Sequence, residues 1–199
     1  MSGVQMTVDP RWVIAARGDD VAVEVESQLG LVPQTGSDEE WREIRSGVIE
    51  LLVEELESGA QWAAAFLVRE PEGSLVVARA SARFDLELVE EAGTLYDDAL
   101  LAHRDDPYQT TLQLVETRIG VAVHQRQLLE PPDGQPLEYD AYLIPGRTGG
   151  MLVECFCSPV GWAGLWGPSL ESMVLSLRAD ATVPEGTISL VTFVFSEVE

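Results

Sequence analysis

The sequence has no lysine and no asparagine among its 199 residues, and it has only two cysteines and two histidines. Without lysine the chain cannot form a Schiff base, a P-loop phosphate site or a Ser-Lys dyad. Without asparagine it has neither a papain-type Cys-His-Asn arrangement nor an N-glycosylation sequon. The G-x-S-x-G and G-x-G-x-x-G patterns are also missing, so a nucleophile elbow and a dinucleotide site have no support.

Basic charge is scarce as well, because 12 arginines face 34 aspartates and glutamates, for a net charge of −22. Such a surface repels phosphate backbones and anionic lipid and attracts basic partners over roughly 8 to 10 Å at physiological salt. We therefore expect no nucleic-acid and no membrane partner, and we expect a protein partner, which could be a basic one. The absence of lysine and asparagine also fits a GC-rich coding bias, which would make part of the acidity a property of the genome.

No stretch approaches the roughly 18 to 20 apolar residues that span a bilayer. Residues 1–10 lack a basic region followed by an apolar one, so no signal peptide is predicted and the expected location is cytoplasmic. Hydrophobic residues make up 46% of the chain, which indicates a folded protein. We predict one domain over residues 1–199, with a core at about 10–180 and a C-terminal linker and apolar strand at 181–199.

A capped amphipathic helix is the clearest element. Ser37 is followed three residues later by Glu40, the capping-box spacing. An apolar stripe then recurs every three to four residues (Trp41, Ile44, Val48, Leu52, Leu56), and Gly59 is placed to end the helix. The intervening acids are predicted to face water, and they could also serve as an acidic docking surface.

Two strands are predicted after this helix. Residues 61–69 are apolar on both faces, residues 70–73 form a turn, and residues 74–84 alternate apolar and polar side chains. The small side chains of Ala78, Ala80 and Ala82 would let a helix pack closely, and the 37–59 helix is the nearest candidate.

The rest of the chain predicts an α+β fold, with an antiparallel meander sheet of about six to eight strands flanked by two or three helices. Short strands are expected at 11–16 and 21–25, a loop at 29–36, a helix at 94–103, and four further strands at 111–117, 119–129, 137–144 and 151–157. A closing helix should have Pro168 near its first turn, with Trp162 and Trp166 just before it. Residues 187–195 are apolar on both faces and must be covered by their own sheet or by another chain, so a second copy could associate there.

Two sets of residues are candidates for a pocket or interface. Trp162 and Trp166 lie in a glycine-rich stretch and could line a ligand groove together with His124, or they could simply close the end of the core. Phe193 and Phe195 belong to the apolar C-terminal segment. His124 could also form an acid/base pair with Glu138 or Asp140 across a hairpin, although a structural histidine is favoured.

Cys155 and Cys157 form a C-x-C pattern on a predicted strand, so both thiols should point to one face. With His103 and His124 they could compose a metal set, but the spacing is that of no zinc site, and the acid-rich 85–106 region fits no EF-hand loop. Buried apolar thiols are favoured over a redox pair. No metal, cofactor or catalytic residue is predicted.

In its order of elements the chain resembles the PsbP-like fold family. The likeness covers roughly residues 10 to 180 and includes the phrases GAQWAAAFLVRE and SLESMVLSLR. This resemblance implies an antiparallel sheet flanked by helices, and a protein that acts by binding other proteins rather than by catalysis.

The function expected from the sequence is a non-enzymatic protein-interaction or accessory module with a strongly acidic surface. One alternative is a small-ligand binder or hydrolase with a pocket near Trp162, Trp166 and His124. The other is an acidic inhibitor that mimics nucleic acid, which would need carboxylates regularly spaced along one face.

Overall fold

The computed structural model describes residues 4–29, 37–70, 73–85, 91–105, 110–130, 134–146, 149–158, 160–179 and 191–195. The elements in these ranges are β1 (Val4–Val8), β2 (Trp12–Ala16), α1 (Val21–Leu29), α2 (Asp38–Glu57), β3 (Trp62–Glu70), β4 (Gly73–Asp85), α3 (Ala92–Ala102), β5 (Thr111–Thr117), β6 (Gly120–Leu129), β7 (Leu137–Ile144), β8 (Gly150–Cys157), α4 (Ala163–Ser176), β9 (Arg178–Ala179) and β10 (Val191–Phe195). The predicted α+β class is confirmed: seven of the strands form one antiparallel sheet.

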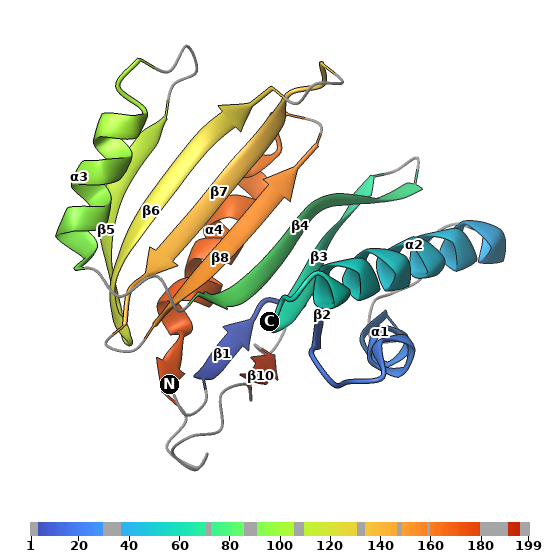
Figure 1. Cartoon of the computed structure of the whole chain (residues 1–199). Coiled ribbons are helices and arrows are strands. Elements are labelled where there is room, and N and C mark those ends of the chain that lie inside the picture. Colours follow the sequence, from blue (N-terminus) through green and yellow to red (C-terminus); the bar gives the residue numbers. More distant parts are fainter. Residues whose placement is uncertain are drawn as a thin grey trace.

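The large sheet joins two meanders side by side. Its strand order is β2-β3-β4-β8-β7-β6-β5, and every neighbouring pair is antiparallel. The junction is the pairing of β4 with β8, which aligns Ala80 with Cys155. The chain therefore crosses from β4 at the centre to β5 at the far edge, and α3 lies on this path (Figure 1).

A smaller sheet has the order β10-β1-β9, and in it β10 is parallel to β1. The apolar C-terminal strand is thus paired within its own chain over residues 191–195, while the predicted linker and residues 187–190 lie outside the described residues. Residues 30–36 of the predicted loop lie outside them too.

Helix α2 forms as its sequence predicts. The Ser37 hydroxyl accepts a hydrogen bond from the Glu40 N–H, and the Glu40 carboxylate accepts one from the Ser37 N–H, so the capping box is confirmed. Gly59 follows the helix at φ 109°, a conformation that glycine adopts without strain.

Two hydrophobic cores lie on opposite faces of the sheet. On one face, α1 and α2 pack on β2 and β3 through residues that include Val48, Leu52, Ala63 and Ala65. The core on the other face is larger, and α4 and β1 cover it. Its buried residues include Trp12, Trp62, Phe66, Tyr142, Trp166, Leu170 and Met173. Figure 1 shows α2 and α3 at the two sides of the viewed face, with α4 behind the sheet.

The prediction that helix α2 packs on the small side chains of β4 is wrong. Ala78, Ala80 and Ala82 belong to the core on the α4 face, whereas α2 packs on the opposite face against Ala63 and Ala65. Both β3 and β4 carry small residues on the face toward a helix, so sequence distance alone did not decide between the two helices.

The predicted strand at 21–25 is also wrong, because these residues begin α1. Its alternation of valine with other residues suggests a strand, but the buried side chains are Val25, Gln28 and Leu29, which have helical spacing. Strand β2, at the predicted position 11–16, forms one edge of the large sheet.

Helix α4 begins one turn earlier than predicted. Trp162 is its N-cap residue, Trp166 lies within it, and Pro168 is in its interior instead of its first turn. The apolar stripe explains this, since Trp166 precedes Leu170 by four residues and both are buried. Pro168 faces solvent, where its ring disturbs the packing least.

Candidate binding groove

The five residues that the sequence offered as a pocket or interface lie in three parts of the fold: Trp162 and Trp166 at α4, His124 on β6, and Phe193 and Phe195 on β10. Trp166 is fully buried in the α4 core, and Trp162 is half-buried beside it. His124 is buried on β6. Phe193 and Phe195 lie on β10, where they are aligned with Met6 and Val8 of β1.

His124 is at the centre of a cluster of polar side chains. Its Nε2 is bonded to Oδ1 of Asp140, and Asp140 Oδ2 accepts hydrogen bonds from Arg126 Nε at 2.9 Å and Arg126 Nη2 at 2.6 Å. Its Nδ1 lies 2.6 Å from Nε2 of Gln113, and its ring stacks on Tyr142 with centroids 4.2 Å apart. Asp140 has no exposed surface, so this carboxylate is both desolvated and paired.

These contacts assign His124 a structural arrangement. Nε2 faces the Asp140 carboxylate, and Nδ1 faces the side-chain amide of Gln113. Both ring nitrogens are then engaged, and neither is free to take a proton from a bound substrate. Burial opposes the charge on Arg126, but its hydrogen bonds to Asp140 and the charge of that carboxylate outweigh this effect and raise the pKa of Arg126.

A small cavity of about 260 Å³ lies next to this cluster. Its lining comprises Thr111, Arg126, Gln127, Leu128, Glu138, Ala163 and Trp166. Of the three residues that the ligand-binding hypothesis places together, the described lining thus contains Trp166 and neither Trp162 nor His124. The carboxylate of Glu138 accepts hydrogen bonds from the N–H groups of Gly161 and Ala163, so it holds the start of α4.

Both cysteines are buried in the α4 core and neither is in a disulfide. Burial is the main cause that raises the pKa of Cys157 to about 11, and burial followed by the negative charge of Asp140 raises the pKa of Cys155 well above its ordinary value. Neutral thiols are poor nucleophiles and poor metal ligands. In the part of the chain that the structure describes, no three His, Cys, Asp or Glu side chains are grouped so that they could hold a metal ion.

The most distinctive surface is a groove on the face that carries α2 and α3. The hydrogen-bonded alignment Gln125–Ala141–Glu154–Ser81–Ala63 puts these five residues on one face of the sheet. Gln125 lies 3.0 Å from His103 at the end of α3, and Ala63 packs under α2, so the two helices cover opposite margins of the same face. The strands between them are left uncovered by either helix.

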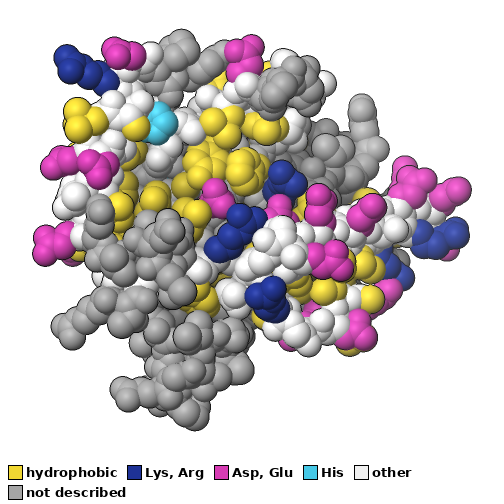
Figure 2. All heavy atoms as spheres, in the orientation of Figure 1, with side chains coloured by type: hydrophobic (Ala, Val, Ile, Leu, Met, Phe, Trp, Pro, Cys, Tyr) yellow, Lys and Arg dark blue, Asp and Glu magenta, His cyan; other side chains and the backbone are white. Residues whose placement is uncertain are grey.

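The floor of this groove is apolar and aromatic. Tyr139 of β7 and Phe156 of β8 are aligned across the sheet with their ring centroids 5.0 Å apart, and the guanidinium carbon of Arg79 lies 5.3 Å from the centroid of the Phe156 ring. The Tyr139 hydroxyl donates to Glu154 at 2.9 Å. Figure 2 shows hydrophobic side chains gathered over the middle of the sheet, between α3 and α2.

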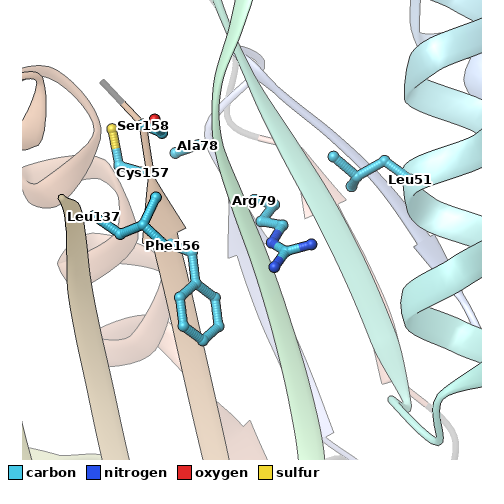
Figure 3. Close-up of a pocket in the computed structure, with 7 residues that line it drawn as sticks. All are labelled: Leu51, Ala78, Arg79, Leu137, Phe156, Cys157 and Ser158. Carbon is cyan, nitrogen blue, oxygen red and sulfur yellow. The ribbon is translucent and has the colours of Figure 1, made fainter. Parts of the chain in front are cut away.

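A cavity of about 240 Å³ opens in this floor toward α2. Its lining residues are Leu51, Ala78, Arg79, Leu137, Phe156, Cys157 and Ser158. Figure 3 shows Arg79 and Phe156 next to each other on neighbouring strands, with Leu51 of α2 across from them. We call this surface, from Leu51 and Arg79 to Tyr139 and Leu137, the aromatic groove.

The margin of the aromatic groove on the α2 side contains an ion-pair network. Glu55 lies 3.5 Å from Arg79 and 3.8 Å from Arg83, and Arg83 donates to the Ser58 hydroxyl at 3.1 Å. Among the exposed acids of α2, Glu50, Glu54 and Glu57 form no ion pair with another described residue. On the α3 side the exposed residues include Asp97 and Asp98. Both helices that flank the apolar floor thus have exposed acids.

Sequence reasoning placed Tyr139 and Phe156 on strands but did not identify them as a surface. The available signal was the alternation in β8, where Leu152, Glu154 and Phe156 face away from the buried Cys155 and Cys157. The sequence shows that this face is amphipathic, and only the pairing of β4 with β8 brings Arg79 beside Phe156.

Comparisons with known proteins assign no family. No protein-family model matches the chain, and no curated protein is similar to it in sequence. Solved structures with a related arrangement include PA94, a Pseudomonas aeruginosa protein of unknown function, at 13% identity and a TM-score of 0.41, covering 59% of this chain and 99% of that one. LpqN, involved in cell envelope biogenesis of Mycobacterium tuberculosis, aligns at 7% identity and a TM-score of 0.39 over 61% of this chain and 72% of its own.

A third structure, from Bacteroides thetaiotaomicron, aligns at 16% identity and a TM-score of 0.29 over 60% of this chain and 46% of its own. These likenesses concern the fold alone and carry no function. Among the described helices, none combines the length and the hydropathy that crossing a bilayer requires.

Proposed function

We propose that this protein is a non-enzymatic binding module that takes up an apolar segment of a basic partner protein in the aromatic groove. The observation behind this proposal is the sheet face between α2 and α3, which neither helix covers in the part of the chain that the structure describes, with the partly exposed Tyr139 and Phe156 on its floor. Aromatic side chains that stay partly exposed on a rigid sheet are typical anchors of protein interfaces.

The charge around the groove selects the partner. A segment with apolar residues in its middle and Arg or Lys at its ends would place the apolar part on Phe156 and the charges near the acids of α2 and α3. The whole-chain charge of −22 adds long-range attraction for such a partner. Membership of the PsbP-like family and a cytoplasmic location are part of the same proposal, and the order of helices and strands supports the family.

The small-ligand and hydrolase alternative has less support. The engaged nitrogens of His124 and the salt-bridged Asp140 leave no free acid/base pair, and the described lining of the nearby cavity omits Trp162. The nucleic-acid mimic is supported by net charge alone.

A photo-crosslinking amino acid placed at position 156 tests the proposal in cells. A control protein carries the same group at Leu175, which is exposed on α4 at the opposite side of the sheet. We expect one protein with basic, amphipathic segments to be cross-linked at position 156 and not at 175. Equal cross-linking at both positions, or none at 156, would contradict the groove as the binding surface.

The purified partner then allows a quantitative test. We expect Phe156→Ser and Tyr139→Ser each to weaken binding by about tenfold or more, since anchor residues contribute roughly 1 to 2 kcal/mol or more. Leu175→Ser is the matched control and should bind as the wild type does. Circular dichroism of each variant shows whether the fold is retained.

A further inference from the structure

We infer that the free edge of β5 is a self-association surface, at which β5 of one copy pairs antiparallel with β5 of a second copy. The inference is independent of the aromatic groove. It starts from the two edge strands of the large sheet, β2 and β5, which differ in whether side chains bond their outer backbone groups.

The β2 edge is closed by side chains. Gln28 of α1, which is buried, accepts a hydrogen bond from the Ile14 N–H at 2.9 Å and donates one to the Ile14 carbonyl at 2.7 Å. The Asp19 carboxylate accepts from the Ala16 N–H at 2.8 Å. These side chains occupy the backbone groups that another strand would use, a known way of preventing edge-to-edge pairing.

The β5 edge has no such closure among the described residues. Among the described strands β5 pairs only with β6, over Thr111–Thr117, and it contains no proline, lysine or arginine that would discourage pairing. Most of its side chains are exposed or half-exposed, including Leu114 at 51%.

Exposed apolar side chains concentrate around this edge. Eight large hydrophobic residues are exposed in the described structure, and four of them lie on α3, β5 or β6: Leu100, Leu101, Leu114 and Val121. Between α3 and β5 lies a groove of about 780 Å³, whose lining includes Leu100, Leu101, Leu112 and Arg104. This apolar surface continues from the strand edge onto the helix, as expected of an interface larger than a strand pair.

The sequence of β5 complements itself. Pairing all seven residues of two antiparallel copies puts Leu114 opposite Leu114 on the two-fold axis, Leu112 opposite Glu116 and Thr111 opposite Thr117. Like charges are never opposite each other in this alignment, and leucine meets leucine at its centre.

Charge also fits a second copy. Leu112 and Arg104 line the same groove, and Glu116 of a paired copy would lie opposite Leu112. Each Arg104 is thereby brought near the Glu116 of the other molecule, twice by symmetry. Within the described residues neither Arg104 nor Glu116 is in an ion pair, so both are available for this contact. A foreign strand could pair with the backbone, but it would lack this reciprocal arrangement.

Sedimentation velocity over roughly 1 to 200 μM tests the inference. We expect a concentration-dependent dimer of the full chain, which Leu114→Glu weakens by about tenfold or more, because it places two carboxylates on the axis. Leu175→Glu, a similar change on α4, and Phe156→Ser in the aromatic groove should leave the dimer unchanged. A wild-type chain that stays monomeric throughout, or a Leu114→Glu dimer of normal strength, would overturn the inference.

A charge exchange tests the proposed alignment. Arg104→Glu and Glu116→Arg should each weaken the dimer, and the double variant R104E/E116R should restore it to within about threefold, because the reciprocal pairs form again with their signs reversed. A double variant weaker than both single variants would contradict this alignment.

Oxidation of a Leu114→Cys variant gives a direct geometric readout. Residues opposite each other in an antiparallel pair have Cβ atoms about 4.5 to 5.5 Å apart, close enough for a disulfide to form with little adjustment. We expect a covalent dimer from this variant and none from Leu175→Cys, since the native Cys155 and Cys157 are buried. Failure to form it in a protein that sediments as a dimer would show that another surface is used.

Discussion

Asp140 is a carboxylate with no exposed surface, held between the ring of His124 and the guanidinium of Arg126. Removing such a charge from water costs several kcal/mol of desolvation free energy, and the interactions with its two partners offset this cost. Removing one member of the cluster therefore leaves the others desolvated without compensation.

Asp140→Ala is thus expected to lower the free energy of unfolding by about 3 to 5 kcal/mol, the usual cost of breaking a buried ion pair from one side. Urea unfolding followed by circular dichroism measures it. Asp97→Ala removes an exposed carboxylate from α3 and should change stability by less than about 0.5 kcal/mol. A small effect at both positions would mean that Asp140 is not paired as the structure has it.

The two buried thiols predict a pH dependence of stability. The folded pKa of Cys157 is raised to about 11 and that of Cys155 is raised as well, in both cases chiefly by burial, whereas an unfolded thiol ionises near pH 8.5. A raised folded pKa contributes stability that is fully present below the unfolded pKa and is lost as pH rises through the folded value. Unfolding free energy should therefore fall between pH 8.5 and 10, by about 1 to 2 kcal/mol per thiol.

The variant C155A/C157A removes this dependence, so its stability should change far less over the same pH range, whatever its absolute value. Tyr139 and Tyr142 also have raised pKa values, mainly through burial, but an unfolded tyrosine ionises only near pH 10 and contributes above this range. Equal slopes for the two proteins would show that the thiols are solvated.

At the scale of elements, Gln28 shows how a helix can close a sheet. Gln28→Ala would leave the N–H and carbonyl of Ile14 without their partners at a buried edge, and we expect a loss of about 1 to 3 kcal/mol. Ser27→Ala changes an exposed neighbour on the same helix and should be nearly neutral. Thermal unfolding of both variants measures the difference. An open β2 edge should also raise the tendency of the Gln28→Ala protein to aggregate.

The elements that the sequence predicted best are those whose local signals agree. Helix α2 has a capping box, an apolar stripe and a terminal glycine, and β5 to β8 alternate cleanly between turns. The prediction for residues 21–25 failed because the segment VAVEVE alternates as a strand does, and it is the packing of α1 on β2 that stabilises the helix. Local periodicity cannot decide such a segment, since its burial comes from residues far away in the chain.

The candidate site lies beyond local signals for the same reason. Phe156, Tyr139 and Arg79 belong to three strands, and the β4–β8 pairing that brings them together aligns Arg79 with Phe156, which is 77 positions away in the chain. The sequence predicted the His124–Asp140 hairpin contact as one of two alternatives because the two strands are adjacent in the chain. Nothing local to the sequence indicates that α2 and α3 leave the strands between them uncovered.

For the whole molecule, the charge of −22 makes opposite predictions for the two proposed associations. Two copies of this chain repel each other at long range, so added salt should strengthen dimerisation through β5 even though it weakens the local Arg104–Glu116 pairs. A basic partner is attracted at long range, so added salt should weaken its binding to the aromatic groove.

Raising ionic strength from about 20 to 300 mM, which shortens the Debye length from roughly 20 Å to 6 Å, should therefore tighten the dimer and loosen the partner complex in the same buffers. Sedimentation gives the first constant, and fluorescence anisotropy of a labelled partner segment gives the second. The E116R variant is not a suitable control here, because it alters the dimer contact itself; Glu57→Gln, on the exposed side of α2, changes the net charge by one and should shift both constants only slightly. If both associations weaken with salt, local ion pairs outweigh the net charge at the β5 edge. If both associations strengthen with salt, apolar contacts alone hold the partner, and the proposal that the partner is basic is wrong.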